Sequence, residues 1–391
     1  MTDKSQNTKD EKKKSSAKGV ILILLLTAVI IALIFVLTSK FQNSENLSEG
    51  VSENVQETEQ TVSSNNKTGF PVSFSGEIDT VALTDSSVYV LTDNEVTLLS
   101  SNGTVLQDFI LNFTDPMIKS SSKYALAYDR QGSGFYLFDR KKVVYEGKSD
   151  GEGQIISGYV CDSGKFLIAS RHTEATSALT YYSKTGEIIF QWLCTNEHIV
   201  SCAVSENGNS LICAALNSEK AKILTKVYYF DISSSKNNRE YTFDSTAAID
   251  CFFTSGRNAA VVCSDKRIYI KCAKDDSESV ICDYPSSLQK RASDKNGYTA
   301  VVTSKAQSPD ENILLLYDDS NTLVYQIDIS SDIDDIACFG KKVYLLTDNE
   351  IIKVSSSGYA VTVCEVSAKQ DGIEVNSHGI YHFTTSMLYC D

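Results

Sequence analysis

The chain has 391 residues and a formal net charge of −14, with 20 Tyr, 16 Phe, 20 Gly and only 4 Pro. The low Pro and Gly content excludes collagen-like and Pro-rich architectures, and the many aromatic and β-branched residues favour strands. The acidic charge argues against nucleic acid as a partner, because it repels the phosphate backbone. The length allows one large repeat domain or two ordinary domains.

Residues 19–38 are predicted to form a transmembrane helix. Residues 19–37 contain no charged side chain and one polar side chain, Thr27. A helix of this length spans about 30 Å, which is the thickness of the hydrocarbon core of a bilayer. A cleaved signal peptide is the alternative, but its apolar part usually has about 7–15 residues and ends at a small-residue cleavage site, which is not evident here.

The lysines on the two sides of this segment predict its orientation. Lys12, Lys13, Lys14 and Lys18 precede it, and only Lys40 follows closely. The positive-inside rule therefore places residues 1–18 in the cytoplasm as a short basic tail and everything after the helix outside the cytoplasm. The predicted localisation is the cell membrane, in a single pass.

The remainder divides into a linker and a folded domain. Residues 39–69 are rich in Ser, Asn, Glu, Gln and Thr, so they bury too little apolar surface to offset the entropy lost on ordering, and a disordered linker is predicted. From residue 70 to residue 391 short apolar or alternating runs follow one another between turn residues, without a helical period. This part is predicted to be all-β.

Internal repeats identify the kind of β domain. Residues 88–103 read VYVLTDNEVTLLSSNG and residues 343–358 read VYLLTDNEIIKVSSSG, with 10 of 16 positions identical. Between them, Gly-containing turns such as CDSGK, SENGN and SKTG each precede an apolar run, as expected where a hairpin needs positive φ. Units of about 40 to 50 residues with four short strands are typical of the blades of a β-propeller. The units are predicted to start at Ile78, Pro116, Ile155, His198, Ala248, Leu288, Asp332 and Gln370.

The last unit has room for three strands only. The run FPVSFSG at residues 70–76 precedes the first unit, at the place where the outer strand of a preceding blade would stand. It would supply the missing partner for the open edge of the last blade, and Pro71 is tolerated on an outer strand. We therefore predict eight blades, with seven as the alternative.

The turns resemble those of known propellers. CDSGKFL is similar to repeats of YVTN and WD40-like propellers, and SKTGEIIFQW resembles a quinoprotein-type repeat. Layout and repeats together resemble an uncharacterised Gram-positive family of membrane-anchored propeller proteins. The single Trp, Trp192, does not support binding of a quinone cofactor, and no cofactor is expected.

Few residues suggest chemistry. The acidic run with Asp328, Asp332, Asp334 and Asp335 could offer oxygen ligands to calcium, but it lacks the central Gly and terminal Glu of an EF-hand loop, so a solvated loop is the preferred interpretation. The other candidates are the four histidines. His378 and His382 are a conceivable metal pair or general base, but two partly exposed hairpin histidines are the preferred interpretation, and His172 and His198 stand in no catalytic context.

The cysteines are interpreted mainly as buried hydrophobes. Cys202, Cys251 and Cys338 occupy like places in successive units, as do Cys213 and Cys263 one strand later. Small apolar residues are common at such positions. One or two disulfides remain the alternative, and a metal site is not expected because no CxxC occurs and no His lies near Cys at zinc-ligand spacing.

The sequence therefore predicts no catalytic, cofactor-binding or metal-binding residue. Its leading functional interpretation is a non-enzymatic binding or scaffolding module that presents a loop face to a protein, peptide or envelope polymer. The alternatives are an extracytoplasmic hydrolase or lyase with carboxylates at the channel mouth, and a ligand sensor acting through a membrane partner, for which Ala28 and Ala32 would offer a weak helix-packing face.

Overall fold

The computed structural model describes residues 69–391, except residues 220, 235–237, 255–257, 273–276 and 306–307. The predicted cytoplasmic tail, the predicted transmembrane helix and residues 39–68 of the predicted linker lie outside the described residues. In the part of the chain that is described, no helix has the length and apolar character needed to cross a membrane.

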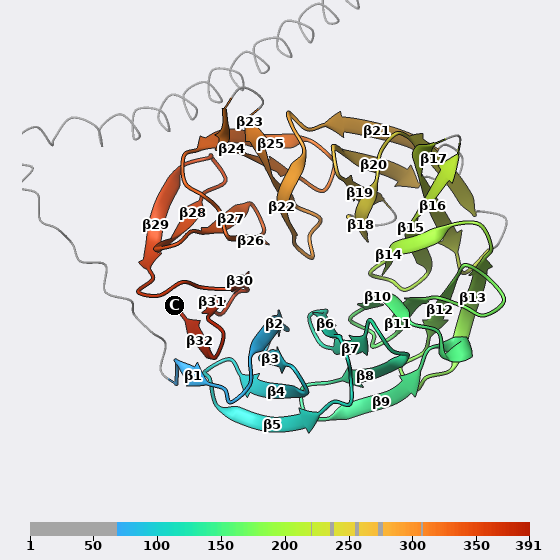
Figure 1. The fold of residues 1–391 in the computed structure, drawn as a ribbon, viewed down its shortest axis with the longest axis horizontal. Coiled ribbons are helices and arrows are strands. Elements are labelled where there is room, and N and C mark those ends of the chain that lie inside the picture. The colour runs from blue at the N-terminus through green and yellow to red at the C-terminus, as the bar shows by residue number, and fades with distance from the viewer. Residues whose placement is uncertain (1–68, 220, 235–237, 255–257, 273–276, 306–307) are drawn as a thin grey trace, which may run out of the picture. The chain divides into compact units, whose positions relative to one another are not determined.

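The described residues form eight antiparallel sheets of four strands each, arranged around a ring (Figure 1). The domain is therefore an eight-bladed β-propeller, as predicted, and the seven-bladed alternative is wrong. Seven blades consist of four strands consecutive in sequence, while the eighth has the order β1-β32-β31-β30.

Blades 1 to 4 take the chain from β2 to β17. Blade 1 contains β2 (Ile78–Leu83), β3 (Ser87–Thr92), β4 (Glu95–Ser100) and β5 (Val105–Ile110). Blade 2 contains β6 (Pro116–Ser120), β7 (Ala125–Asp129), β8 (Gly134–Phe138) and β9 (Val143–Lys148), followed by the short 3₁₀ helix η1 (Asp150–Glu152). Blade 3 contains β10 (Ile155–Val160), β11 (Phe166–Ser170), β12 (Ser177–Tyr182) and β13 (Ile188–Cys194). Blade 4 contains β14 (His198–Val204), β15 (Ser210–Glu219), β16 (Lys222–Asp231) and β17 (Arg239–Asp244).

Blades 5 to 8 complete the ring. Blade 5 contains β18 (Ala248–Phe253), β19 (Ala259–Cys263), β20 (Lys266–Cys272) and β21 (Ser277–Asp283). Blade 6 contains β22 (Leu288–Ser293), β23 (Thr299–Lys305), β24 (Ser308–Tyr317) and β25 (Leu323–Ile329). Blade 7 contains β26 (Asp335–Phe339), β27 (Lys342–Leu346), β28 (Glu350–Val354) and β29 (Ala360–Glu365). Blade 8 contains β30 (Gly372–Val375), β31 (Ile380–Phe383), β32 (Met387–Cys390) and β1 (Val72–Ser73).

The position of a strand within its blade determines its sequence pattern. The first strand of each blade lies nearest the centre of the ring (Figure 1). The second strands are mainly apolar, as in ALAYD of β7 and AAVVC of β19, and every residue of these two strands is buried. Neighbouring blades cover both faces of these strands, so both sets of alternating side chains enter the core.

The outer strands are largely exposed, in contrast to the buried second strands. β17, with the sequence REYTFD, alternates between half-buried and exposed side chains, and most residues of β5 are exposed. In β17, Tyr241 and Phe243 pack into the core layer between blades 4 and 5, and the residues that follow each of them are exposed, which gives the period of two. The core is therefore a set of layers between blades rather than one central mass.

The turn glycines adopt the predicted conformation. Gly164 of CDSGK, Gly208 of SENGN and Gly186 of SKTG have φ values of 79°, 70° and 84°. The first strands of blades 1 to 6 begin at the predicted residues, from Ile78 to Leu288. The last two begin later, at Asp335 and Gly372 rather than at Asp332 and Gln370, because irregular loops precede them.

The ring closes through the predicted segment. Val72 pairs with Leu388 and Ser73 with Met387, antiparallel, at the outer edge of blade 8. Phe70 is buried, and its ring lies edge-on to that of Tyr381 with centroids 5.9 Å apart. Residues from the two ends of the domain therefore share one sheet and one core layer.

Replacing Phe70 by Ala should destabilise the whole propeller rather than fray one end. Removing a buried aromatic side chain costs about 3–5 kcal/mol, and the lower part of that range is expected because Phe70 lies at the periphery. Urea unfolding of the full-length protein in detergent would measure the loss. Tyr359→Ala is the control, since its side chain is 70% exposed. Equal midpoints for the two variants would contradict the closure through Phe70.

Candidate functional site

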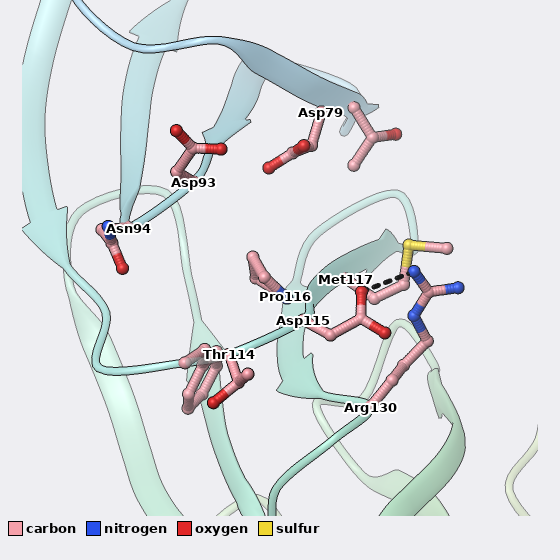
Figure 2. Close-up of a pocket in the computed structure, with 10 residues that line it drawn as sticks. Asp79, Asp93, Asn94, Thr114, Asp115, Pro116, Met117 and Arg130 are labelled. Atoms are coloured by element: carbon pink, nitrogen blue, oxygen red, sulfur yellow. Dashed lines mark hydrogen bonds and ion pairs between the residues drawn. The ribbon is translucent and has the colours of Figure 1, made fainter.

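An open cleft of about 550 Å³ lies between blades 1 and 2. Its walls come from the start of β2, the turn between β3 and β4, the link from β5 to β6, and the turn after β7. Figure 2 shows Asp79 and Asp93 on one side of this cleft and the Asp115–Arg130 pair on the other. The complete lining is Asp79, Thr80, Asp93, Asn94, Phe113, Thr114, Asp115, Pro116, Met117 and Arg130.

Asp129, at the end of β7, holds the link that forms one wall of the cleft. Its buried carboxylate accepts hydrogen bonds from the backbone N–H groups of Thr114 and Asp115, both at 3.0 Å. Arg130 adds an ion pair to Asp115, with Nη2 2.6 Å from Oδ1. The end of β7 and the turn that follows it therefore order the neighbouring link. The cleft is thus preformed by the fold.

The cleft has an excess of negative charge. Arg130 pairs with Asp115, whereas Asp79 and Asp93 make no ion pair with any described residue. Partial burial and the neighbouring carboxylates, Asp93 first among them, raise the pKa of Asp79. Repulsion of this kind is relieved when a cation binds between the carboxylates. Apolar side chains of Phe113, Pro116 and Met117 lie beside the charges, so the cleft suits a cationic group on an apolar stem.

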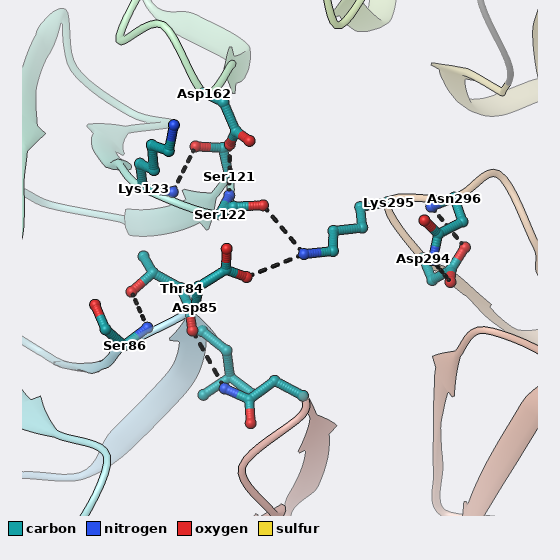
Figure 3. Close-up of polar contacts among 12 residues, drawn as sticks. Thr84, Asp85, Ser86, Ser121, Ser122, Lys123, Asp162, Asp294, Lys295 and Asn296 are labelled. Atoms are coloured by element: carbon teal, nitrogen blue, oxygen red, sulfur yellow. Dashed lines mark hydrogen bonds and ion pairs between the residues drawn. The ribbon is translucent and has the colours of Figure 1, made fainter.

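At the end of the ring opposite the cleft, the polar groups are already paired with one another. Among the described residues, six turns between first and second strands make polar contacts with the turn of a neighbouring blade. In one of these contacts the backbone N–H of Asp85 donates to the carbonyl of Ser122 at 2.9 Å. Lys295, in the corresponding turn of blade 6, donates to Asp85 Oδ1 at 3.0 Å and to Ser122 Oγ at 3.2 Å (Figure 3). Because β22 stands across the ring from β2 and β6 (Figure 1), this side chain spans the centre. The first strand of each blade begins at the end of the ring that carries the cleft.

Charged side chains of the first strands meet inside the ring. Arg291 on β22 binds Asp250 on β18, with Nη1 2.6 Å from Oδ2, and Ser201 on β14 donates to the other carboxylate oxygen. Burial alone would raise the pKa of Asp250, but Lys119 of β6 and Arg291 outweigh it and lower that pKa. First strands of four different blades therefore share one electrostatic network.

A second pair of carboxylates lies on the first strands of blades 7 and 8. Burial raises the pKa of Asp335, whose Oδ2 accepts the Ile373 N–H at 3.0 Å. The many protein atoms that surround Glu374 inside the ring, and then the charge of Asp335, raise the pKa of Glu374, although part of its surface still contacts solvent. A carboxyl group that keeps its proton near neutral pH can act as a general acid.

The structure separates the acidic run that suggested calcium. Asp328 on β25 pairs with Lys305 at 3.0 Å on the outer side of blade 6, while Asp335 faces the ring interior. Asp332 is exposed in the loop, and the carbonyl of Asp334 accepts a hydrogen bond from Lys290. These carboxylates do not converge, so the run is a connecting loop, as the preferred interpretation has it.

The histidines do not form the conceivable pair. His378 is exposed in the turn between β30 and β31, and its Nε2 lies 2.6 Å from the carbonyl oxygen of Asp85. His382 lies on β31 and is buried, which corrects the prediction of a partly exposed hairpin residue. His172 lies in a loop beside Asp150, with Nε2 3.6 Å from Oδ2, and His198 is exposed at the start of β14.

The cysteines behave as the repeat positions predicted. Ten described cysteines are free thiols, of which nine are buried and Cys282 is partly exposed. Cys202, Cys251 and Cys338 lie on first strands, and Cys213 and Cys263 on second strands. Burial raises the pKa of the Cys202 thiol to about 12. Such thiols are poor nucleophiles, because the reactive form is the thiolate.

Residues 58–381 match the model of a family of unknown function, DUF5711. The chain belongs to the DUF5711 family. No curated protein matches its sequence.

Solved structures similar to this DUF5711 protein are propellers of low sequence identity. The C-terminal WD40 domain of Sif2 gives a TM-score of 0.59 at 10% identity, covering 83% of this chain and 98% of that one. Sqt1 of Saccharomyces cerevisiae gives 0.54 at 9% identity, covering 83% and 99%. Apo AztD from Citrobacter koseri gives 0.53 at 9% identity, covering 81% and 90%. At these identities the similarity shows the fold alone.

Asp250→Asn should destabilise the DUF5711 propeller by about 1–3 kcal/mol, because it leaves Lys119 and Arg291 without a counter-charge but in partial contact with solvent. Since the pKa of Asp250 is lowered by folding, its contribution is present above about pH 4 and is lost as the pH falls below that value. The acid branch of the stability profile should therefore be shallower in the variant.

Urea unfolding at pH 7 and between pH 5 and pH 2.5 would measure both effects. Asp328→Asn is the matched control, because its exposed pair with Lys305 contributes only about 0–1 kcal/mol. An Asp250→Asn variant as stable as the control, with the wild-type acid branch, would show that the interior network is not a stabilising element.

Proposed function

We propose that this DUF5711 protein is a membrane-anchored, extracytoplasmic binding module that captures a protein or peptide partner through the cleft between blades 1 and 2. The observation that carries the proposal is the unpaired Asp79–Asp93 carboxylates beside the apolar side chains of the cleft. A lysine or arginine side chain of a partner supplies both a cation and an apolar stem, which fits this lining.

The rest of the propeller supports a binding role. The ring is closed and its walls are held by buried hydrogen bonds such as those of Asp129, so the cleft needs little ordering when a partner arrives. At the other end of the ring, Lys295 already occupies Asp85 and Ser122. The cleft end is therefore the better supported docking face.

Hydrolysis is the less well supported alternative. The raised pKa of Glu374 would suit a general acid, but neither Glu374 nor Asp335 lines the cleft between blades 1 and 2. A sensor would also use the cleft, and it would differ only in passing occupancy to a membrane partner.

Neutralising the cleft should weaken capture of the partner. Asp79→Asn/Asp93→Asn removes the two unpaired charges, and a roughly tenfold loss of affinity is expected because exposed charge pairs contribute up to about 1 kcal/mol each. Mild crosslinking in membranes, followed by affinity purification of the tagged full-length protein, would measure the recovered partner. The effect should shrink at high salt, which screens exposed charges.

Asp108→Asn is the matched control for this experiment. It removes the same charge from the same blade, but Asp108 is exposed on the outer strand β5. Undiminished capture by the double variant would contradict docking at the cleft, and absence of any constant partner from the wild type would contradict the binding module itself.

The topology part of the proposal has its own test. A tag at the N-terminus should be protected from protease added to intact cells or protoplasts, while the part after Ser39 is digested, because the lysine asymmetry places the basic tail inside. Immunoblotting for tags at both ends would measure this. Release of an unanchored propeller beginning near Lys40 would favour a cleaved signal peptide instead.

A further inference from the structure

Cys364, His382 and Asp391 come together at the seam between blades 7 and 8. Cys364 lies on β29, His382 lies on β31, and Asp391 follows β32. The Asp391 Oδ2 atom is 3.1 Å from the Cys364 Sγ and 2.9 Å from the His382 Nε2. All three donor atoms lie within 4.8 Å of one another. No other group of three or more His, Cys, Asp and Glu side chains among the described residues meets this geometry.

The cluster is buried. Cys364 and His382 are 2% and 4% exposed, and the Asp391 side chain is 11% exposed. On its outer side the ring of Tyr389 stacks on that of His382, with centroids 5.1 Å apart and an angle of 7°. Charged or polar groups buried to this extent need partners for each of their lone pairs and protons.

Gln370 fixes the tautomer of His382. The Gln370 amide nitrogen donates to the carbonyl of Ala368 at 2.9 Å, so its Oε1 is the atom that faces His382 Nδ1, at 2.8 Å. An amide oxygen can only accept a hydrogen bond, and therefore Nδ1 carries the proton. In neutral His382, Nε2 then presents a lone pair to the carboxylate of Asp391.

This arrangement sets two acceptors against each other. The Nε2 lone pair and the Asp391 Oδ2 atom are separated by 2.9 Å, which is repulsive unless a proton or a metal ion lies between them. Asp391 Oδ1 is also buried and accepts no hydrogen bond from a described residue. The Cys364 thiol already donates to Oδ2, so in neutral His382 the two atoms that receive no hydrogen bond from a described residue are Nε2 and Asp391 Oδ1.

We propose that Cys364, His382 and Asp391 bind a divalent metal ion of the zinc type. Thiolate, imidazole and carboxylate are the three ligand types that zinc takes in proteins, and the mixed set disfavours calcium and magnesium, which prefer oxygen ligands alone. The Nδ1–H of His382 bound to Gln370 is the usual outer-shell support for a metal-binding imidazole. Asp391 Oδ1 or a water molecule completes four-coordination.

The proton balance of binding follows from these contacts. The Cys364 thiol gives up its Sγ–H proton to solvent, and any proton held between Nε2 and Oδ2 leaves with it, so that the metal ion replaces one or two protons. No oxidant or reductant takes part. The ion would join the last strand of blade 7 to two positions in blade 8, and its role would be to hold these blades together.

Titration with Co²⁺ tests the site, because this ion reports on its own ligands. The full-length protein, purified in detergent and stripped of metal, should bind one Co²⁺ per chain, with a thiolate-to-cobalt charge-transfer band and the visible absorption of a tetrahedral centre. Zn²⁺ should displace the cobalt and raise the melting temperature, since it binds the folded state.

Variants identify the ligands. Cys364→Ser should lose the charge-transfer band and at least tenfold in affinity, and Asp391→Asn should lose affinity while keeping the band. Cys338→Ser is the matched control, because it removes a buried thiol from another strand of blade 7. A wild-type protein that takes up no stoichiometric Co²⁺ or Zn²⁺ would overturn the proposal whatever the stability of the variants, and so would an unchanged spectrum in Cys364→Ser. The first result would leave His382 as an imidazolium ion paired with Asp391.

Discussion

The pairing of β1 with β32 is the constraint on which the rest of the ring depends. Each blade is covered on both faces by its neighbours, so a blade that is incomplete exposes a sheet edge and also deprives the adjacent core layer of part of its cover. Blade 8 obtains its fourth strand from residues that precede blade 1 in the sequence. Because Phe70, Val81 and Tyr381 share one core cluster, closure joins the start of the domain to its last blade through apolar packing as well as hydrogen bonds.

The two ends of the closed ring are chemically different, and a network of charged side chains lies between them inside the ring. Asp250 and Arg291 connect first strands across blade boundaries inside the ring, where lower water content strengthens their attraction. At one end Lys295 satisfies the turn carboxylate of Asp85. At the other end Asp79 and Asp93 remain without a cation from the described residues. The cleft end thus presents carboxylates that a cation from a partner can neutralise.

The sequence predicted the fold better than the site, for a physical reason. Strand positions follow local rules: a glycine at positive φ, such as Gly208, ends one strand and starts the next, and burial on both faces gives a continuous apolar run such as β19. The closure by residues 70–76 was predictable because an unpaired edge is costly. Where an irregular loop precedes the first strand, as before Asp335, the predicted start was displaced.

The sites depend on contacts that no local pattern encodes. Asp79, Asp93 and Asp115 come from a strand start, a turn and a link between blades, and each is unremarkable in its own segment. Asp93 belongs to the repeated TDNE sequence. In both copies the backbone carbonyl of the Asn accepts the same hydrogen bond, from Leu111 N–H to Asn94 and from Val366 N–H to Asn349. The repeat therefore reflects blade geometry and gave no signal for the cleft.

The Cys364–His382–Asp391 cluster lies beside blade 8, which has the shortest strands of the described ring. In blade 8, β30, β31 and β32 have four residues each and β1 has two, whereas the strands of the other blades have five to ten. Short strands supply fewer ladder hydrogen bonds and less buried area, so local opening is expected to begin at such a seam. A ligand that binds only the closed seam stabilises it in proportion to its own binding free energy. A metal ion at this cluster would therefore stabilise a seam that is built from short strands, in the same blade that β1 completes at its outer edge.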